Sequence, residues 1–365
     1  MSRFPPQPKI LRMTRRTKHI AAVIAATCIA LALLASALTG NQVQVDSGYR
    51  LAMGTFARII AVAPNEAVAQ KSIDAGFSRQ KRVEELMSVY IPESELNRVN
   101  AKAHQHPVRV HPMTFEVIER AVEWSRKSNG AFDVTIGPLV ELWRSAGDAN
   151  QPPSAEQLAE ARTRIGYDKL ILDANQLTVQ FTAPGMKLDL GGIAKGYAID
   201  QSVKAMRSAG ASAGMVDIGG DISCFGSPAE SRKHWRIGLQ DPSRADLNMA
   251  ESANLLVLQF ATPSNDAIAV TTSGNYQRFT VIEGRRHSHI IDSESGQSSD
   301  ALASVTIIAP DATAADALAT AVSVLGAEEG LRLIENTPEA EGILISSSDV
   351  KCLIESSGVG QYIKQ

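Results

Sequence analysis

The stretch that most constrains the fold is residues 188–200, which read Leu-Asp-Leu-Gly-Gly-Ile-Ala-Lys-Gly-Tyr-Ala-Ile-Asp. Apolar residues lead into paired glycines, and Ile199, Val203 and Met206 then follow the spacing of one face of a helix. Gly210 is placed to end that helix. The pattern predicts a strand that passes into a helix through a glycine-rich turn. Such a turn lets a ligand approach the backbone closely, and a helix N-terminus favours anions.

The spacing of these glycines does not match two common nucleotide-binding motifs. It lacks the G-x-G-x-x-G of a dinucleotide-binding Rossmann fold and the Gly-Lys-Ser/Thr of a P-loop. Nucleotide binding stays an alternative, but neither of these two folds is indicated. Asp189 and Lys195 add one charge of each sign, and a tight turn with two surface charges is the alternative interpretation.

The first forty residues differ from the rest in charge and hydropathy. They contain six basic residues and no acidic ones, and positions 20–38 are almost all apolar. This length is enough for a helix to span a bilayer, and the basic side stays in the cytoplasm. We therefore divide the chain into residues 1–40, a basic tail with a signal peptide or membrane anchor, and an outward-facing domain of residues 41–365.

The sequence is compatible both with a signal peptide that is cleaved off and with a membrane anchor that is retained. Ala35-Ser36-Ala37 has the small-x-small form of a signal peptidase site, whereas the long apolar run favours an anchor. Residues beyond 40 carry 30 basic and 39 acidic side chains, which argues against nucleic acid as the main partner. Two cysteines remain in this part of the chain, Cys224 and Cys352. Two cysteines are too few for a framework of disulfides, and a single disulfide between them stays an alternative.

Runs of strand patterns with a few helical patterns between them predict an α+β fold. The predicted helices outside the central stretch are 66–90, 112–129 and 314–325, the last ending at Gly326. Hairpins are predicted at 169–181 and at 278–291, where the turn falls on Glu283-Gly284. Residues 145–156 are predicted to be a loop. The other extended segments are 49–63, 216–222, 235–239, 255–260, 268–272, 304–309, 342–346 and 352–355.

Two groups of residues carry side chains suited to metal binding or to acid–base catalysis. Asp316 and Thr320 are four apart on one predicted helix and therefore lie on one face, where a carboxylate and a hydroxyl offer oxygen ligands to a hard cation such as Mg²⁺. The alternative is an acid favoured by the helix dipole, with Thr320 bonded back to a carbonyl. His289 ends a predicted strand three residues before Asp292 and can serve as a general base, or it is a surface hairpin histidine.

Eight short segments follow one another along the chain: Met53-Gly54-Thr55, Ser88-Val-Tyr-Ile-Pro-Glu-Ser-Glu-Leu-Asn97, Gly130-Ala-Phe-Asp-Val-Thr135 with Pro138, Leu188–Asp200, Asp217-Ile-Gly-Gly-Asp221, Thr272-Ser-Gly-Asn-Tyr276, His289-Ile-Ile-Asp292 and Ala315-Asp-Ala-Leu-Ala-Thr320. Taken together and in this order, they resemble the ApbE family of FAD:protein FMN transferases, from about Met53 to about Gly326. One such match is weak, whereas this ordered set is specific.

The resemblance implies a mixed-sheet core flanked by helices, with a largely helical subdomain. It implies Mg²⁺-dependent transfer of FMN from FAD to a threonine or serine hydroxyl of a partner protein, with release of AMP. Implied partners are subunits of sodium-pumping NADH:quinone reductases or Rnf-type electron-transport complexes, or periplasmic domains with a flavinylation motif. The implied location is the bacterial inner membrane, with the catalytic domain facing the periplasm or the cell exterior.

The resemblance also assigns roles to single residues. Contacts to FAD would fall on Met53, Tyr90, Ala131, Phe132, Asp133, Asp189, Lys195 and Ile290. Ligands of Mg²⁺ would be the Gly192 carbonyl, Asp316, Thr320 and the Ala319 carbonyl. His289 would be the base, with Asp292 beside it at the catalytic position. The rings of Phe132 and Tyr90 offer flat faces for the flavin or adenine.

The chain departs from the family pattern after Asp292, where Ser293 stands in place of the usual proline. A proline would stiffen this turn, so the departure bears on how the loop holds His289. Two other functions stay open. One is hydrolysis of FAD to FMN and AMP, with water in place of the partner hydroxyl, and the other is FAD binding without catalysis.

Overall fold

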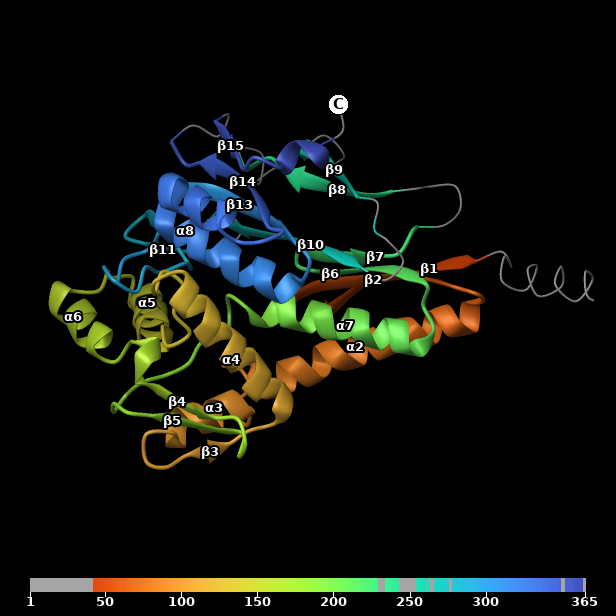
Figure 1. Cartoon of the computed structure of the whole chain (residues 1–365). Helices are drawn as coiled ribbons and strands as arrows, with labels where there is room; N and C mark the ends of the chain where they lie inside the picture. Colours follow the sequence, from red (N-terminus) through yellow and green to blue (C-terminus); the bar gives the residue numbers. More distant parts are fainter. Residues whose placement is uncertain are drawn as a thin grey trace, which may run out of the picture. The chain divides into compact units, whose positions relative to one another are not determined.

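An eight-stranded antiparallel sheet forms the centre of the fold (Figure 1). Its strands, in spatial order, are β1 (Val43–Ala52), β2 (Thr55–Ala63), β6 (Ala213–Ile218), β7 (Asp221–Phe225), β10 (Ala267–Gly274), β13 (Leu302–Ala309), β14 (Glu341–Ser346) and β15 (Leu353–Glu355). The computed structural model describes residues 42–228, 234–242, 254–260, 262, 266–275, 278–348 and 352–363.

The predicted signal or anchor segment, residues 1–40, lies outside the described residues. Within the ranges given above, no helix combines the length and the apolar character needed to cross a bilayer. By its contacts, the chain from Val43 onward is a unit separate from the residues before it.

The prediction of a mixed sheet is wrong, because every neighbouring pair in the described main sheet is antiparallel. Helical excursions between neighbouring strands return the chain to the end of the sheet that it left. Between β13 and β14 this return occurs in α8 (Ala312–Glu335), which is broken at Gly326. There the backbone has φ 77° and ψ −171°, a conformation suited to glycine. The sequence placed the helix end at Gly326, whereas the helix resumes beyond it.

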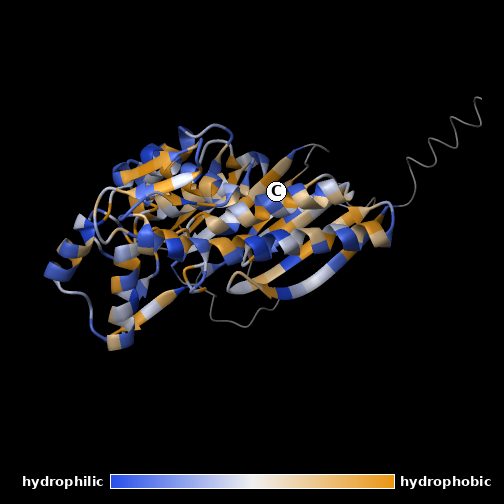
Figure 2. Cartoon of the chain, turned by 90° about the horizontal axis from the view of Figure 1, so that it is seen from below, coloured by the Kyte–Doolittle hydropathy of each residue, from blue (hydrophilic) through white to orange (hydrophobic). Residues whose placement is uncertain are grey.

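Three helices cover one face of the sheet, and a small hairpin covers the other (Figure 1). α2 (Glu66–Met87) packs against α7 (Ala194–Ala209), and α8 packs against α7, β10 and β13. Their apolar faces meet in the main core. The opposite face carries β8 (Trp235–Gln240) and β9 (Asn254–Phe260) over a second core cluster. In Figure 2, hydrophobic and hydrophilic residues alternate along these elements, as expected when each has one buried side.

Between α2 and α7 the chain forms the largely helical region that the resemblance predicted. Its helices are α3 (Glu95–Lys102), α4 (Pro112–Lys127), α5 (Gly137–Ala149) and α6 (Ala155–Thr163). A small sheet joins β3 (Val108–Arg109), β5 (Thr178–Phe181) and β4 (Leu170–Asp173). The hairpin β11 (Phe279–Ile282) and β12 (Arg285–Ser288) contacts α5 and turns at Glu283 and Gly284, as predicted.

Two local predictions need correction. Residues 49–63 are a hairpin rather than one extended segment, because Met53 and Gly54 both adopt positive φ and turn the chain. The strand predicted to end in paired glycines within 216–222 is confirmed, since β6 ends at Ile218 and Gly219-Gly220 turn the chain into β7. The predicted loop 145–156 begins later, since α5 runs to Ala149. Cys224 is buried, Cys352 is exposed, and neither forms a disulfide.

Candidate active site

The turn before α7 is held by backbone and side-chain hydrogen bonds. The Asp189 N–H donates to the Val134 carbonyl over 2.9 Å, and the Asp189 carboxylate accepts from the Gly191 N–H over 2.7 Å. Residues 188–190 belong to no strand, so the predicted strand is absent although the predicted helix follows. Burial raises the pKa of Asp189, and the Arg144 charge opposes that rise.

α7 and α8 meet closely at the start of α7. A Cβ on Gly196 would collide with the Ala312 carbonyl, and a Cβ on Gly192 would lie 2.8 Å from Thr320 Oγ1. The Gly196 N–H donates to Asp316 Oδ2 over 3.0 Å. The glycine turn therefore faces both Asp316 and Thr320. This close approach requires glycine at these two positions.

Asp316 is a buried carboxyl with one oxygen still available. Burial raises the pKa of Asp316 to about 6; Lys195 opposes the rise, and Asp221 adds to it. Oδ2 is bonded to Gly196, and no partner of Oδ1 lies among the residues that the structure describes. Thr320 Oγ1 likewise makes no hydrogen bond with the described residues, so the back-bonded threonine alternative is not what the structure contains. A carboxylate and a hydroxyl are thus free to bind a cation on one face of α8.

Lys195 forms an ion pair with Asp221, which is almost fully buried. The other oxygen of Asp221 accepts from the Thr272 N–H over 3.0 Å, so β7 and β10 fix the carboxylate. Burial by itself lowers the pKa of Lys195, but the Asp221 and Asp316 carboxylates outweigh it and raise the pKa. The ammonium therefore stays charged beside Asp316. It is partly exposed and can meet an anionic ligand.

His289 lies near this charged group, since the Lys195 charge contributes to its titration. His289 Nδ1 is 2.9 Å from the Arg278 carbonyl oxygen, which can only accept, so Nδ1 carries the proton and Nε2 is the basic nitrogen. The ring is open to solvent, yet surrounding protein still lowers its pKa through lost solvation, with Arg278 and Lys195 adding to the effect. The imidazole is thus neutral at pH 7.

The turn after His289 is fixed by two of its own residues. Asp292 accepts from the N–H groups of Glu294 and Ser295 and from the Ser295 hydroxyl, so its described side-chain bonds all stay within the turn. The Ser293 hydroxyl donates to the Gly130 carbonyl over 2.8 Å. This bond ties the histidine loop to the Gly130 segment at the position where the family usually has proline.

A model of the ApbE family matches residues 53–344, most of the chain. The chain belongs to the ApbE family. The curated FAD:protein FMN transferase of Treponema pallidum (strain Nichols) is 33% identical over 318 residues, covering 83% of this chain and 85% of the relative. Its counterpart in Vibrio cholerae serotype O1 is 32% identical over 287 residues, covering 78% and 82%. Membership makes this chain an enzyme of the transferase class.

Solved ApbE structures share the fold. A crystal structure of the ApbE protein from Thermotoga maritima has a TM-score of 0.77 at 28% identity and covers 89% of this chain and 100% of that chain. The flavin transferase ApbE from Vibrio cholerae has a TM-score of 0.73 at 28% identity and covers 88% and 99%. Both likenesses extend over the sheet, its helices and the helical region.

The residues that the ApbE resemblance assigned to FAD lie in different environments. Met53 is half-buried at the turn of the β1–β2 hairpin, and Tyr90 is 76% exposed. Phe132 is buried, with Cε2 only 3.2 Å from where a Cβ on Gly192 would lie, so its ring supports the turn instead of offering a free face. Their contacts with FAD stay a prediction.

Ala131, Asp133 and Ile290 are held by the protein itself. The Ala131 N–H donates to the Ser128 carbonyl, and the Ile290 carbonyl accepts from the Ser299 N–H. Asp133 is buried, which raises its pKa, and it accepts from the N–H and hydroxyl of Thr135 and from the Tyr167 N–H. Its carboxylate therefore shapes the local loop. Ala319 is fully buried in α8.

Sequence reasoning missed four residues that organise the site. Asp221 lay within a matched segment, but nothing in its spacing indicated Lys195 as its partner. Arg278 holds His289 through its carbonyl, which no side-chain pattern reveals. Arg144 lies 5.1 Å from the centre of the Tyr90 ring and close to Asp189. Asp200 accepts from the N–H groups of Ala312 and Thr313 and so fixes the start of α8.

Proposed function

We propose that this chain transfers FMN from FAD to a threonine or serine hydroxyl of a partner protein, with release of AMP and with dependence on Mg²⁺. The observation that carries the proposal is the approach of Asp316 and Thr320 to the Gly192 turn at the start of α7. The names of the curated relatives support the flavin chemistry. The threonine or serine target is what the family resemblance implies, and the metal is inferred from that resemblance together with the oxygen atoms of the site.

The residues present fit Mg²⁺. The ion prefers oxygen ligands and is commonly held by one or two carboxylates together with substrate phosphates. Asp316 Oδ1 and Thr320 Oγ1 supply such oxygens, and the Gly192 and Ala319 carbonyls are the backbone candidates. No cluster of three or more His, Cys, Asp or Glu side chains suited to a metal occurs among the described residues, which agrees with a site completed by a substrate. When bound, Mg²⁺ would neutralise charge on the two linked phosphates.

The protein's own groups can bind the rest of the diphosphate. The N-terminus of α7 carries a partial positive charge that favours an anion, although the Ala194 and Gly196 N–H groups already donate to the Leu190 carbonyl and to Asp316. The Lys195 ammonium adds a full positive charge at the same turn. These donors are fixed before the reaction, so they stabilise developing negative charge without reorganisation.

In the proposed reaction, His289 accepts the proton from the attacking hydroxyl. The hydroxyl oxygen forms a bond with the FMN phosphorus, the bond from that phosphorus to the bridging oxygen breaks, and AMP leaves with that oxygen. Nε2 takes the proton, because Nδ1 is committed to the Arg278 carbonyl. A serine or threonine hydroxyl is a weak nucleophile, so a neutral imidazole beside it raises the rate.

One assay separates transfer from hydrolysis and from binding alone. The full chain is incubated with FAD, Mg²⁺ and a purified soluble domain of a sodium-pumping NADH:quinone reductase subunit that carries an acceptor threonine. Transfer predicts AMP and a fluorescent acceptor band in equal amounts, both lost in Asp316→Asn. Free FMN with AMP and no labelled acceptor indicates hydrolysis. Tight FAD binding without AMP indicates a binding protein. Either of the last two results contradicts the proposal.

We further propose that residues 20–38 tether the chain to the bacterial inner membrane, with the catalytic domain facing the periplasm or the cell exterior. The basic residues before this segment and the apolar run support this orientation. Cell fractionation followed by protease treatment of spheroplasts tests it. The catalytic domain should be digested in intact spheroplasts, and full protection there would contradict the proposed orientation.

A further inference from the structure

Arg278 stands directly opposite His289 at the open end of the β11–β12 hairpin. The register pairs Phe279 with Ser288, and one step outward the backbone N–H and the Nδ1–H of His289 both donate to the Arg278 carbonyl, over 3.4 and 2.9 Å. Side chains directly opposite one another on antiparallel strands share a face. The guanidinium of Arg278 and the imidazole of His289 therefore leave the hairpin on the same side, where both are exposed.

The positive charge of Arg278 acts on both basic groups of the candidate site. Lost solvation is the main cause of the lowered pKa of His289, and the Arg278 charge adds to it. Burial lowers the pKa of Lys195, and the Asp221 and Asp316 carboxylates outweigh it. The Arg278 charge opposes the rise in the pKa of Lys195 that results. Because such effects require charges to be near one another, the Arg278 side chain faces the site.

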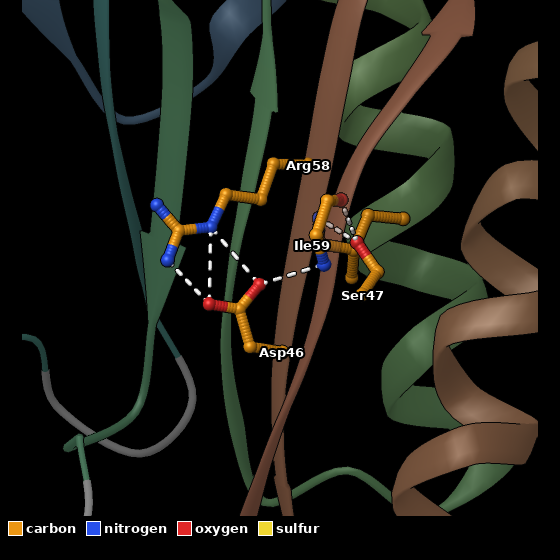
Figure 3. Close-up of polar contacts among 5 residues, drawn as sticks. Asp46, Ser47, Arg58 and Ile59 are labelled. Carbon is orange, nitrogen blue, oxygen red and sulfur yellow. Dashed lines mark hydrogen bonds and ion pairs between the residues drawn. The ribbon is translucent and has the colours of Figure 1, made fainter.

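The guanidinium of Arg278 forms no ion pair with any carboxylate in the part of the chain that the structure describes. Arg58 in β2 is different, since its Nε donates to Asp46 Oδ1 over 2.9 Å and its Nη2 donates to Oδ2 of the same carboxylate (Figure 3). An arginine held in this way has its charge compensated inside the fold. The guanidinium donors of Arg278 are instead available to a ligand.

The proposed reaction needs such an uncompensated cation. Attack on the FMN phosphorus places negative charge on the oxygens of that phosphoryl group and on the leaving group, and fixed positive groups beside them stabilise it. Of the two described cations that act on His289, Lys195 shares its charge with Asp221. Arg278 has no such carboxylate partner among the described residues. Its side chain is therefore the one suited to meet the phosphoryl group beside His289.

We propose that Arg278 is a catalytic residue that binds the non-bridging oxygens of the FMN phosphoryl group of FAD. The proposal rests on the function proposed above and refines it, because it states which of the two phosphates the guanidinium contacts. The hydroxyl oxygen bonds to this phosphorus, His289 takes the hydroxyl proton, and AMP leaves with the bridging oxygen. A side chain that projects beside His289 meets the phosphoryl group under attack, and a planar guanidinium can donate to two of its oxygens at once.

The test compares the full chain in detergent with Arg278→Gln, Arg278→Lys and the control Arg286→Gln. Arg286 is exposed on the same hairpin, but it pairs with Val281 and its guanidinium lies over the Phe279 ring, so it belongs to the other face. Arg278→Gln should lower kcat for transfer by about 10²–10³-fold, as for loss of one fixed donor. Arg278→Lys should recover part of this, because it restores the charge without the planar fork. The backbone carbonyl that holds His289 stays in every variant.

Two further readouts distinguish contact with the phosphate from a structural role. Because the Arg278 charge lowers the pKa of His289, its removal should move the acid limb of kcat/KM to higher pH, whereas Arg286→Gln should leave the limb in place. The second readout is flavin fluorescence in EDTA, where no metal bridges the phosphate. Wild type should bind FMN more tightly than riboflavin, and Arg278→Gln should lose most of this preference while its affinity for riboflavin stays the same.

Several results would overturn the assignment of Arg278 while leaving the proposed function intact. One is transfer by wild type with a kcat and an FMN preference that Arg278→Gln leaves unchanged. A second is loss of a preference for AMP over adenosine instead, which would assign Arg278 to the other phosphate. Equal losses in Arg286→Gln would reduce the effect to net charge, and loss of riboflavin binding in Arg278→Gln would indicate a structural role. No AMP release and no transfer by wild type contradicts the proposed function itself, and the catalytic role of Arg278 falls with it.

Discussion

Replacing Gly192 by alanine tests the contact between the glycine turn and α8. The new Cβ would lie 2.8 Å from Thr320 Oγ1 and 3.1 Å from its Cγ2, well inside ordinary contact distance. The φ of Gly192 is not positive, so alanine meets no backbone strain and the effect comes from the contact alone. Overpacking of this kind costs about 1–3 kcal/mol. If displacement of Thr320 takes up that cost, Mg²⁺ affinity falls roughly 5- to 150-fold.

The assay is AMP release from FAD as a function of Mg²⁺ concentration. Gly360→Ala is the matched control, because a Cβ there meets open space and its φ is also not positive. Adding Thr320→Ser to Gly192→Ala removes the methyl group that would lie 3.1 Å from the new Cβ and gives the hydroxyl room to move, so it should recover part of the affinity. An unchanged Mg²⁺ dependence in Gly192→Ala, with FAD binding intact, would refute the reasoning that Thr320 is a ligand.

Three further perturbations have expected outcomes. Protons compete with Mg²⁺ for Asp316, whose pKa is about 6 without metal, so Mg²⁺ affinity measured by calorimetry should fall as the pH drops below that value. A Mg²⁺ affinity that stays constant between pH 5 and 7.5 would argue against Asp316 as a ligand. Because the pKa of His289 is lowered, kcat/KM should be level above pH 6.5 and fall only at lower pH. The substitution His289→Asn should slow transfer roughly 10²–10⁴-fold without changing the affinity for FAD. If His289→Asn abolished FAD binding instead, the ring would be assigned to substrate binding. Ser293→Ala removes the bond to Gly130 and should lower the free energy of unfolding in urea by about 1 kcal/mol; no change would mean that the loop is held without it.

Local patterns were enough to predict most elements and the common helix face of Asp316 and Thr320 in α8. Spacing alone placed Asp316 and Thr320 on one helix face, and the structure keeps them there. The end of α7 at Gly210 could be predicted because glycine adopts positive φ without strain, and the helix ends there with φ 110°. These features depend on residues a few positions apart.

Features that depend on long-range packing could not be predicted. The ion pair of Lys195 and Asp221 joins α7 to β7, and no local periodicity encodes it. The turn at Met53 was missed because a non-glycine residue adopts φ 53° there, stabilised by the pairing of β1 with β2. The antiparallel order of β13 and β14 follows from a helix that doubles back at Gly326, and a glycine alone does not distinguish a helix end from a break.

A crystal structure of the domain with FAD and Mn²⁺, with the metal located by anomalous scattering, would show directly where the cation binds. We expect a peak bonded to the Asp316 carboxylate and Thr320 Oγ1, against the Gly192 turn and in contact with the diphosphate. A metal bound to the diphosphate elsewhere in the protein, with Asp316 and Thr320 making no contact to it, would show that these two residues are not its ligands.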